Sequence, residues 1–253
     1  MNKIVNGMDK FVEYFKDYTD NYIIVGGTAL NLLLSQVSLK TRSTKDIDMI
    51  LISENLNNEF GKIFWNFIKD GQYKAYKSKD DKIHYYRFIN NSNDIYPKMI
   101  ELFSKKETFV IGKDIIISPI LIDEDISSLS GIILEEEYYN FLLSGKKIIN
   151  NISLLDPIHL IAFKAKAHVD LTNKKNKGFF VNEYDLKKHK NDIFRLLQLL
   201  TKKENIIVNK KIKKDIYDFL NIINEENTNV KQLTNSALSY EDALTLLKNV
   251  YLL

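Results

Sequence analysis

Two acidic residues one position apart, Asp46 and Asp48, stand at the start of an apolar run that ends at Ile52. Alternate side chains of a strand point to the same face, so the two carboxylates are expected to lie side by side. Such like charges repel unless a cation lies between them, and carboxylate oxygens are ligands that Mg2+ prefers. The pair therefore indicates a divalent metal site, with a capped turn bearing solvent-exposed acids as the alternative.

A glycine pair, Gly26-Gly27, follows the apolar run Tyr22–Val25 and precedes a short helical pattern. Glycines at a strand-to-helix turn leave backbone N–H groups accessible to phosphate oxygens. Thr28 adds a hydroxyl there, and Arg42 adds a cation that can neutralise phosphate. A tight turn without a ligand is the alternative, and both interpretations can hold together. With the two aspartates, the turn indicates a site for a nucleoside triphosphate.

This combination resembles the nucleotidyltransferase superfamily, in which a Gly-Gly or Gly-Ser turn is followed by a strand with an Asp-x-Asp motif. The resemblance implies a third acid on a neighbouring strand. The candidate is Glu101, which stands in the apolar run Lys98–Ser104 in place of the commoner Asp. The resemblance also implies that Glu101 helps to hold the metal and to deprotonate the attacking hydroxyl. An exposed residue on an edge strand is the alternative.

Two stretches of the second half, Phe163–Ala167 and Lys187–Leu196, resemble the C-terminal motifs of the AbiEii/AbiGii toxin-like branch of that superfamily. The resemblance covers Tyr22–Leu200. It implies that a lysine of the first stretch and Asp192 of the second belong to the active site. The branch includes toxins of bacterial toxin–antitoxin and abortive-infection systems, and some members add nucleotides to tRNA ends. An antitoxin protein is therefore an expected partner.

Helical periodicity adds two lysines to the candidate site. Lys190 falls within an apolar stripe of the predicted helix Glu183–Leu200, and Lys164 lies on an apolar side of the preceding helix. A lysine in such a position must extend its head to solvent or meet an anion. The two lysines predict a phosphate cleft that faces the acidic strands. Lys166 stands four residues before Asp170, which fits either a phosphate contact or a surface ion pair.

The apolar patterns predict a mixed α/β (α+β) fold, with a mixed sheet and helices followed by a helical C-terminal half. The expected strands are Tyr22–Val25, Ile47–Ile52, Ile83–Ile89, Lys98–Ser104 and Ile115–Ile117. The expected helices are Met8–Tyr18, Thr28–Gln36, Leu56–Lys69, Glu135–Leu143, Pro157–Asn173, Glu183–Leu200, Lys210–Asn224 and Tyr240–Leu252. A boundary near residue 150 predicts a catalytic domain over 1–150 and a helical domain over 151–253 that completes the cleft.

Composition excludes several other classes of protein. The 253 residues contain no Cys, which excludes disulfides and thiolate metal sites, and no apolar run approaches the roughly 20 residues that cross a bilayer. The N-terminus lacks the long apolar stretch of a secretory signal, so we expect a cytoplasmic protein without a membrane partner.

The net charge of the chain, +3, is mild. Lysine runs at 174–177, 187–190 and 210–214 fit a basic surface for phosphates or RNA, or solvated helix faces.

We therefore expect a Mg2+-dependent nucleotidyltransferase, with Mn2+ as an alternative ion, that moves an NMP from an NTP to an acceptor hydroxyl. RNA or tRNA, a protein or a small molecule can serve as the acceptor. A non-catalytic nucleotide- or RNA-binding protein and a metal-dependent nuclease are the alternatives, although the glycine turn favours a triphosphate over the nuclease. The candidate catalytic residues are Asp46, Asp48, Glu101 and Asp192, the first three also being metal ligands. The candidate nucleotide-binding residues are Gly26, Gly27, Thr28, Arg42, Lys164, Lys166 and Lys190.

Overall fold

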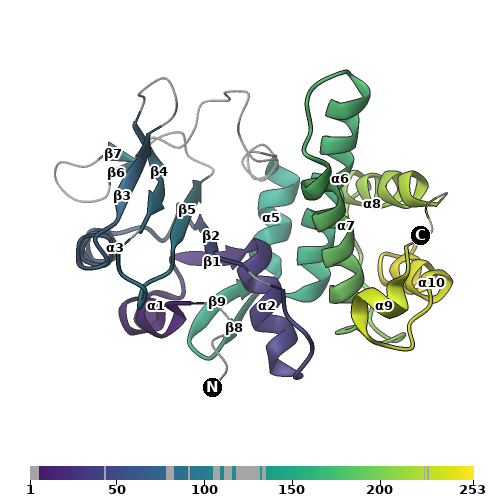
Figure 1. Ribbon diagram of the computed structural model, residues 1–253, viewed down its shortest axis with the longest axis horizontal. Helices are drawn as coiled ribbons and strands as arrows, with labels where there is room; N and C mark the ends of the chain where they lie inside the picture. The colour runs from purple at the N-terminus through teal and green to yellow at the C-terminus, as the bar shows by residue number, and fades with distance from the viewer. Residues whose placement is uncertain are drawn as a thin grey trace. The chain divides into compact units, whose positions relative to one another are not determined.

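A computed structural model describes residues 6–42, 44–77, 83–90, 92–104, 109–110, 116–117, 132, 135–224, 226 and 228–253. The chain divides into two compact units, whose elements are labelled in Figure 1. Unit 1 comprises Met1–Leu32, Thr41–Leu134 and Lys146–Leu155, and unit 2 comprises Leu33–Lys40, Glu135–Gly145 and Asp156–Leu253. The domain boundary that the sequence places near residue 150 falls within a hairpin of unit 1, and the two domains stay a prediction.

A seven-stranded mixed sheet forms the centre of unit 1, in the order β3-β4-β5-β2-β1-β9-β8. Its strands are β1 (Tyr22–Val25), β2 (Asp46–Leu51), β3 (Lys74–Lys77), β4 (Ile83–Ile89), β5 (Met99–Ser104), β8 (Lys146–Ile149) and β9 (Ile152–Leu155). The central strand β2 pairs antiparallel with β1 and parallel with β5. A separate pair joins β6 (Phe109–Val110) to β7 (Ile116–Ile117). The predicted mixed α/β fold is thus confirmed.

The β8–β9 hairpin is a strand pair that the sequence pattern did not predict, because helices were expected throughout the second half. Its turn is made by Asn150 and Asn151, which have positive φ angles of 50° and 61°. Two successive positive φ values are typical of a hairpin turn, and Asn tolerates them better than most residues. The hairpin then adds β9 parallel to β1, with Ile24 opposite Leu154.

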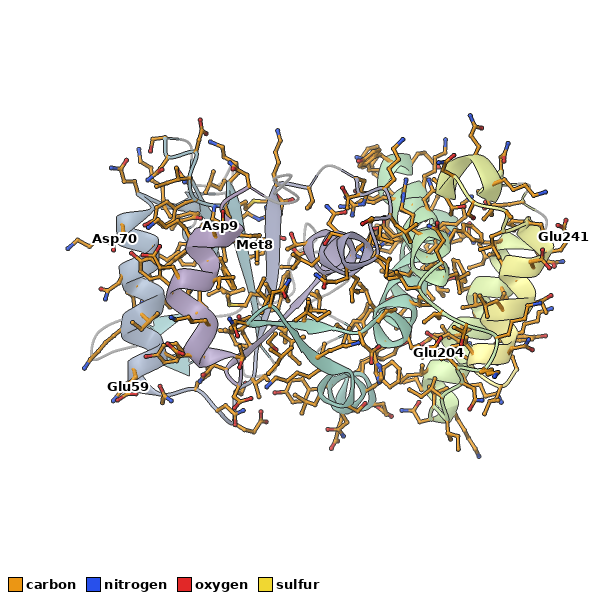
Figure 2. All side chains as sticks on the ribbon, turned by 90° about the horizontal axis from the view of Figure 1, so that it is seen from below. Met8, Asp9, Glu59, Asp70, Glu204 and Glu241 are labelled. Carbon is orange, nitrogen blue, oxygen red and sulfur yellow. The ribbon has the colours of Figure 1, made fainter. Side chains whose placement is uncertain are left out.

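Aromatic side chains build the core beside the helices α1 (Met8–Phe15) and α3 (Asn58–Asp70). Figure 2 shows these two helices side by side, with Glu59 and Asp70 at opposite ends of α3. The rings of Phe11 and Phe15 lie 4.6 Å apart, and Phe15 lies 5.1 Å from Phe67. Buried aromatic residues contribute large apolar areas, so this cluster anchors the sheet from which the candidate site is built.

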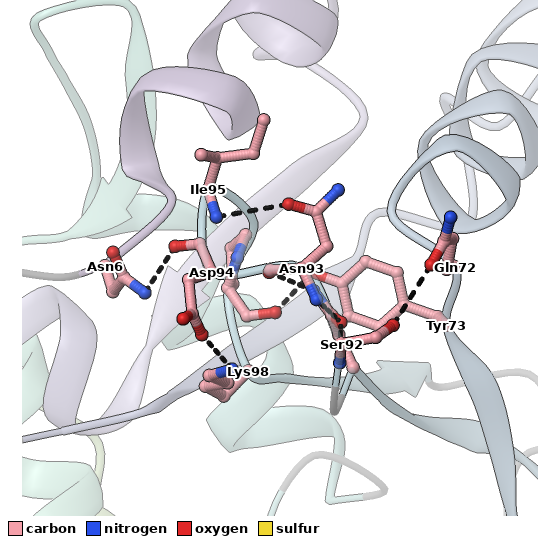
Figure 3. Close-up of polar contacts among 10 residues, drawn as sticks. Asn6, Gln72, Tyr73, Ser92, Asn93, Asp94, Ile95 and Lys98 are labelled. Atoms are coloured by element: carbon pink, nitrogen blue, oxygen red, sulfur yellow. Dashed lines mark hydrogen bonds and ion pairs between the residues drawn. The ribbon is translucent and has the colours of Figure 1, made fainter.

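The loop between β4 and β5 is held by side-chain amides (Figure 3). Asn90 Oδ1 accepts hydrogen bonds from the backbone N–H groups of Ser92 and Asn93, at 3.0 and 2.9 Å. Ser92 donates to Gln72, and Asn6 donates to the Asp94 carbonyl at 2.7 Å. The bonds made by Asn90 and Asn6 satisfy backbone groups of the loop, and together with the Ser92–Gln72 bond they hold the segment that leads into β5.

Unit 2 is built from helices, joined by the second half of α2 (Gly26–Gln36). Its other helices are α5 (Glu136–Ser144), α6 (Pro157–Asn176), α7 (Glu183–Leu197), α8 (Lys210–Ile223), α9 (Val230–Thr234) and α10 (Tyr240–Val250). The side chain of Asp156 caps α6 by accepting from the His159 N–H at 2.9 Å, with Pro157 in the first turn as expected. In the described part of the chain, no helix is long and apolar enough to cross a bilayer.

Candidate active site

The glycine turn and the acidic strand of unit 1 are in direct contact. Gly26 has a φ of 68°, a left-handed conformation that favours glycine. A Cβ atom added to Gly26 would lie only 1.8 Å from Asp48 Oδ2, so the Asp48 carboxylate lies against the bare Cα of this residue. The strand register agrees, because Val25 of β1 is opposite Asp48 of β2. The two motifs that the sequence singled out therefore form one local structure.

A basic side chain lies over the second glycine of the turn. A Cβ atom on Gly27 would lie 2.7 Å from Arg42 Nη2 and 3.0 Å from Thr44 Oγ1. Both side chains therefore come close to the first turn of α2, where the N–H groups carry partial positive charge. An arginine beside a helix N-terminus favours binding of a phosphate. The predicted phosphate contacts Gly26, Gly27 and Arg42 are thus neighbours.

Asn31 is a residue of this site that the sequence analysis missed. Its buried amide donates from Nδ2 to the Arg42 carbonyl at 2.6 Å and accepts from the Arg42 N–H at 3.2 Å. This pair of bonds clamps the backbone of Arg42 to α2, which positions its guanidinium over Gly27. The signal available in the sequence was a lone amide within the apolar run Ala29–Leu34, because a buried polar group requires a partner.

Thr28 connects the turn to the acidic strand through its hydroxyl. The side chain is fully buried, and its Oγ1 donates a hydrogen bond to the Asp46 carbonyl at 2.5 Å. That bond uses the only hydroxyl proton of the residue. In this arrangement Thr28 holds α2 against the first residue of β2, and its direct contact with phosphate stays a prediction.

The three candidate metal ligands share one face of the sheet. Asp46 and Asp48 are alternate residues of β2, and Glu101 of β5 is the parallel register partner of Asp48. Neighbouring strands lie about 4.8 Å apart, so the side chains of register partners stand next to each other. Glu101 is largely buried, as its place on an inner strand requires. The sequence alternative, an exposed residue on an edge strand, is therefore wrong.

Glu101 is paired with a second residue that sequence reasoning missed, Arg87 of β4. The two residues are register partners, and Arg87 Nε lies 2.5 Å from Glu101 Oε1. This ion pair directs the carboxylate along the sheet toward β4. Among the described residues, no three Asp, Glu or His side chains are grouped closely enough to hold a metal ion.

The residue types and backbone positions nevertheless fit a hard divalent cation. Three carboxylates provide the oxygen ligands that Mg2+ and Mn2+ accept, and they share one face of two adjacent strands. Arg87 contacts Glu101 Oε1, so Glu101 would bind such an ion through Oε2 or after its side chain rotates away from Arg87. Asp46, Asp48 and Glu101 would then be the residues that hold it.

In unit 2, Lys164 and Asp192 form a buried ion pair. Lys164 Nζ of α6 lies 3.1 Å from Asp192 Oδ2 of α7, and Arg195 Nη1 lies 3.4 Å from Asp192 Oδ1. The side chains of Lys164 and Asp192 are 6% and 0% exposed. A charged pair this deeply buried requires close contact to offset the loss of hydration. The two stretches that carry the AbiEii/AbiGii resemblance are thus joined by this contact.

The other two candidate lysines are held by acids of unit 2. Lys166 Nζ lies 2.7 Å from Asp170 and 3.8 Å from Glu135, which corresponds to the ion pair considered at the sequence level. Lys190 contacts Glu226 and is mostly buried. Their roles as phosphate contacts, and the single cleft that would unite them with the acidic strands, stay predictions.

Two histidines of unit 2, His189 and His168, have lowered pKa values. Burial lowers the pKa of His189 well below its ordinary value of 6.5, and the charge of Lys164 lowers it further. Its Nδ1 atom is buried and has no hydrogen-bond partner among the described residues. Burial also lowers the pKa of His168, although its Nδ1 lies 3.0 Å from the Leu186 carbonyl. Both rings are therefore neutral at physiological pH.

A solved structure shares the architecture of this chain. It is a crystal structure of an antigenic nucleotidyltransferase-like protein from Paracoccidioides brasiliensis, with a TM-score of 0.51 and 12% sequence identity. The similarity covers 97% of this chain and 94% of that chain. At this identity the likeness shows that the two chains share a fold. No protein-family model matches the chain, and no curated protein matches it by sequence.

Proposed function

We propose that this protein is a Mg2+-dependent nucleotidyltransferase that transfers an NMP from an NTP to a hydroxyl of RNA. The nucleotidyltransferase-like fold supports the general class. The observation that carries the proposal is local: the Asp48 carboxylate lies against Gly26, while Glu101 occupies the register position beside Asp48 on β5. A phosphate-binding turn and paired acids next to each other suit chemistry at a triphosphate.

The transfer joins the acceptor oxygen to the α-phosphorus and breaks the bond from that phosphorus to the β-phosphate bridging oxygen. Pyrophosphate leaves, and the acceptor hydroxyl loses its proton. In the proposal, the N–H groups of Gly26 and Gly27 and the Arg42 guanidinium bind the β- and γ-phosphates. Asp46, Asp48 and Glu101 would hold Mg2+, which would stabilise the charge that develops on the phosphate oxygens. In the proposal, Glu101 would accept the proton of the attacking hydroxyl.

The finer parts of the proposal come from the sequence resemblance. A member of the AbiEii/AbiGii toxin-like branch would act in the cytoplasm, where NTPs and tRNA are available, and an antitoxin protein would restrain it. The buried contact between Lys164 and Asp192 supports this assignment, because it joins the two stretches on which the resemblance rests. As the resemblance implies, we propose that both residues take part in the activity.

The test is a transfer assay with each of the four NTPs labelled on the α-phosphate, in the presence of Mg2+ and total RNA. The wild-type protein is expected to label RNA with at least one NTP. The Asp48→Asn variant keeps the size of the side chain against Gly26 but removes its charge. We expect it to lower the rate on the order of 1000-fold, since metal-assisted stabilisation contributes several kcal/mol to such transition states.

Glu59→Gln provides the matched control, because Glu59 is an exposed acid of the same unit, in the first turn of α3. It should transfer label at the wild-type rate. NTP binding without transfer to any acceptor would support the alternative of a non-catalytic binding protein. The Arg87–Glu101 ion pair favours that alternative, because it already pairs Glu101 with a cation. Equal rates for Asp48→Asn and wild type would refute the assigned site.

A further inference from the structure

Three exposed aromatic residues lie within six positions of one another where α6 leads into α7, the two green helices of Figure 1, with Tyr184 in the first turn of α7. Phe179, Phe180 and Tyr184 are 60%, 96% and 66% exposed. Large apolar side chains at the surface of a globular protein are common singly, whereas a cluster indicates a contact surface. We call the segment Lys174–Lys188, which contains all three rings, the aromatic tip.

The backbone of the aromatic tip is fixed by hydrogen bonds at the end of α6. The Phe179 N–H donates to the Lys174 carbonyl at 3.1 Å, and the Gly178 N–H donates to the Lys175 carbonyl at 2.9 Å. With Gly178 at a φ of 85°, these two bonds form a Schellman motif. The side chain of Asn182 then caps α7 by accepting from the Tyr184 N–H at 2.9 Å. The rings are therefore presented from an ordered backbone.

The composition of the motif explains why Phe179 remains exposed. In a Schellman motif, the residue after the glycine usually packs against an apolar side chain in the last turn of the helix. Here that turn supplies Asn173 and Lys174, so Phe179 has no apolar side chain at the usual position. The adjacent Phe180 is almost fully exposed. Two phenylalanines in water are unfavourable in the isolated protein, and a ligand that covers them would recover apolar burial.

Positive charge surrounds the rings. The aromatic tip contains five lysines, Lys174, Lys175, Lys177, Lys187 and Lys188, and two acids, Glu183 and Asp185. One lysine is engaged within the segment, since Lys175 contacts Glu183 across the loop. The remaining excess of positive charge lies within a few residues of the aromatic side chains. Lysines bind phosphates, and ring faces stack on bases, so this pairing complements single-stranded nucleic acid.

We propose that the aromatic tip is a binding site for single-stranded RNA, with Phe180 and Phe179 stacking on bases and the neighbouring lysines contacting phosphates. This inference deepens the proposed function and rests on it for the role of the RNA as acceptor. The binding itself is independent of transfer chemistry. An anionic membrane surface and a second copy of the chain are the other occupants of such a surface, and the experiment includes both.

The experiment measures binding of a fluorescein-labelled single-stranded RNA, about 12 nucleotides long, by anisotropy without NTP or metal. Phe180→Ala is expected to weaken binding by about 5- to 150-fold, the range for loss of one base–aromatic stack. Phe180→Tyr keeps the ring and should bind like wild type, whereas Phe180→Leu keeps the apolar character and should resemble Phe180→Ala. Lys174→Gln should reduce the slope of log affinity against log salt by about 0.7.

Tyr217→Ala is the matched control, because Tyr217 is an aromatic residue of unit 2 that is 56% exposed on α8. It should leave RNA affinity unchanged. Equal affinity of Phe180→Ala and wild type would overturn the proposal, as would binding to phosphatidylserine vesicles, or self-association, that Phe180→Ala abolishes while RNA binding persists. If Asp48→Asn binds RNA but transfers nothing, both proposals stand. If wild type transfers label and the tip variants bind normally, only this inference fails.

Discussion

Replacing Gly26 with alanine tests the contact on which the candidate active site depends. Alanine at a φ of 68° adopts the left-handed conformation at a cost of about 1–2 kcal/mol. The added Cβ would also lie 1.8 Å from Asp48 Oδ2, so the carboxylate must move. Forcing extra atoms into a packed site costs about 1–3 kcal/mol. We therefore expect Gly26→Ala to lower the free energy of unfolding by about 2–5 kcal/mol in total.

The control for backbone strain is Gly178→Ala. Gly178 has a similar φ of 85°, but a Cβ atom there would meet no heavy atom within 4 Å. Its expected destabilisation is the strain alone, about 1–2 kcal/mol. Urea unfolding followed by circular dichroism gives both values. Fluorescence of Trp65, the only tryptophan of the chain, assigns the transition of unit 1 for the Gly26 variant.

A double-mutant cycle separates the clash from the strain. In an Asp48→Ala background the carboxylate is gone, and of the three atoms nearest to the new Cβ only the Cβ of residue 48, at 3.3 Å, is left. Gly26→Ala should then cost little more than Gly178→Ala. If its effect is the same with and without the Asp48 carboxylate, the two residues are not in contact and our reasoning is refuted. In the transfer assay, Gly26→Ala should reduce the rate by about 100-fold, the usual effect of displacing a catalytic group by about 1 Å.

Two further predictions concern unit 2. Lys164→Met removes one cation from the buried Asp192, which also contacts Arg195, and should destabilise the protein by about 3 kcal/mol. Adding Asp192→Leu should recover part of that loss, and strictly additive effects in urea unfolding would show that the pair is not coupled. The lowered pKa values of the two histidines predict that the free energy of unfolding depends on pH. Because the folded-state pKa values of His168 and His189 lie below 6.5, unfolding takes up protons as the pH falls through 6.5, so the free energy of unfolding should decrease there. A titration of stability from about pH 8 to about pH 5 checks this, and His168→Gln with His189→Gln should flatten the curve.

The sequence by itself determined the part of the site that is local in the chain. Apolar runs identified β1, β2 and β5, and the glycine pair identified the turn into α2. These elements follow one another closely in the chain. The contact between Gly26 and Asp48 therefore arises locally, because β2 follows α2 and pairs antiparallel with β1. The alternation of side chains along β2 also placed Asp46 and Asp48 on one face.

Only the tertiary structure decided the contacts between remote segments. The place of Glu101 beside Asp48 depends on the parallel pairing of β2 with β5, and its ion pair with Arg87 depends on the antiparallel pairing of β5 with β4. The clamp from Asn31 to Arg42 and the buried pair of Lys164 with Asp192 likewise join separate elements. A periodic pattern tells which face of an element is apolar, but it contains no information about which other element covers that face. That choice is made when the whole chain packs, because each buried polar group must then find its partner.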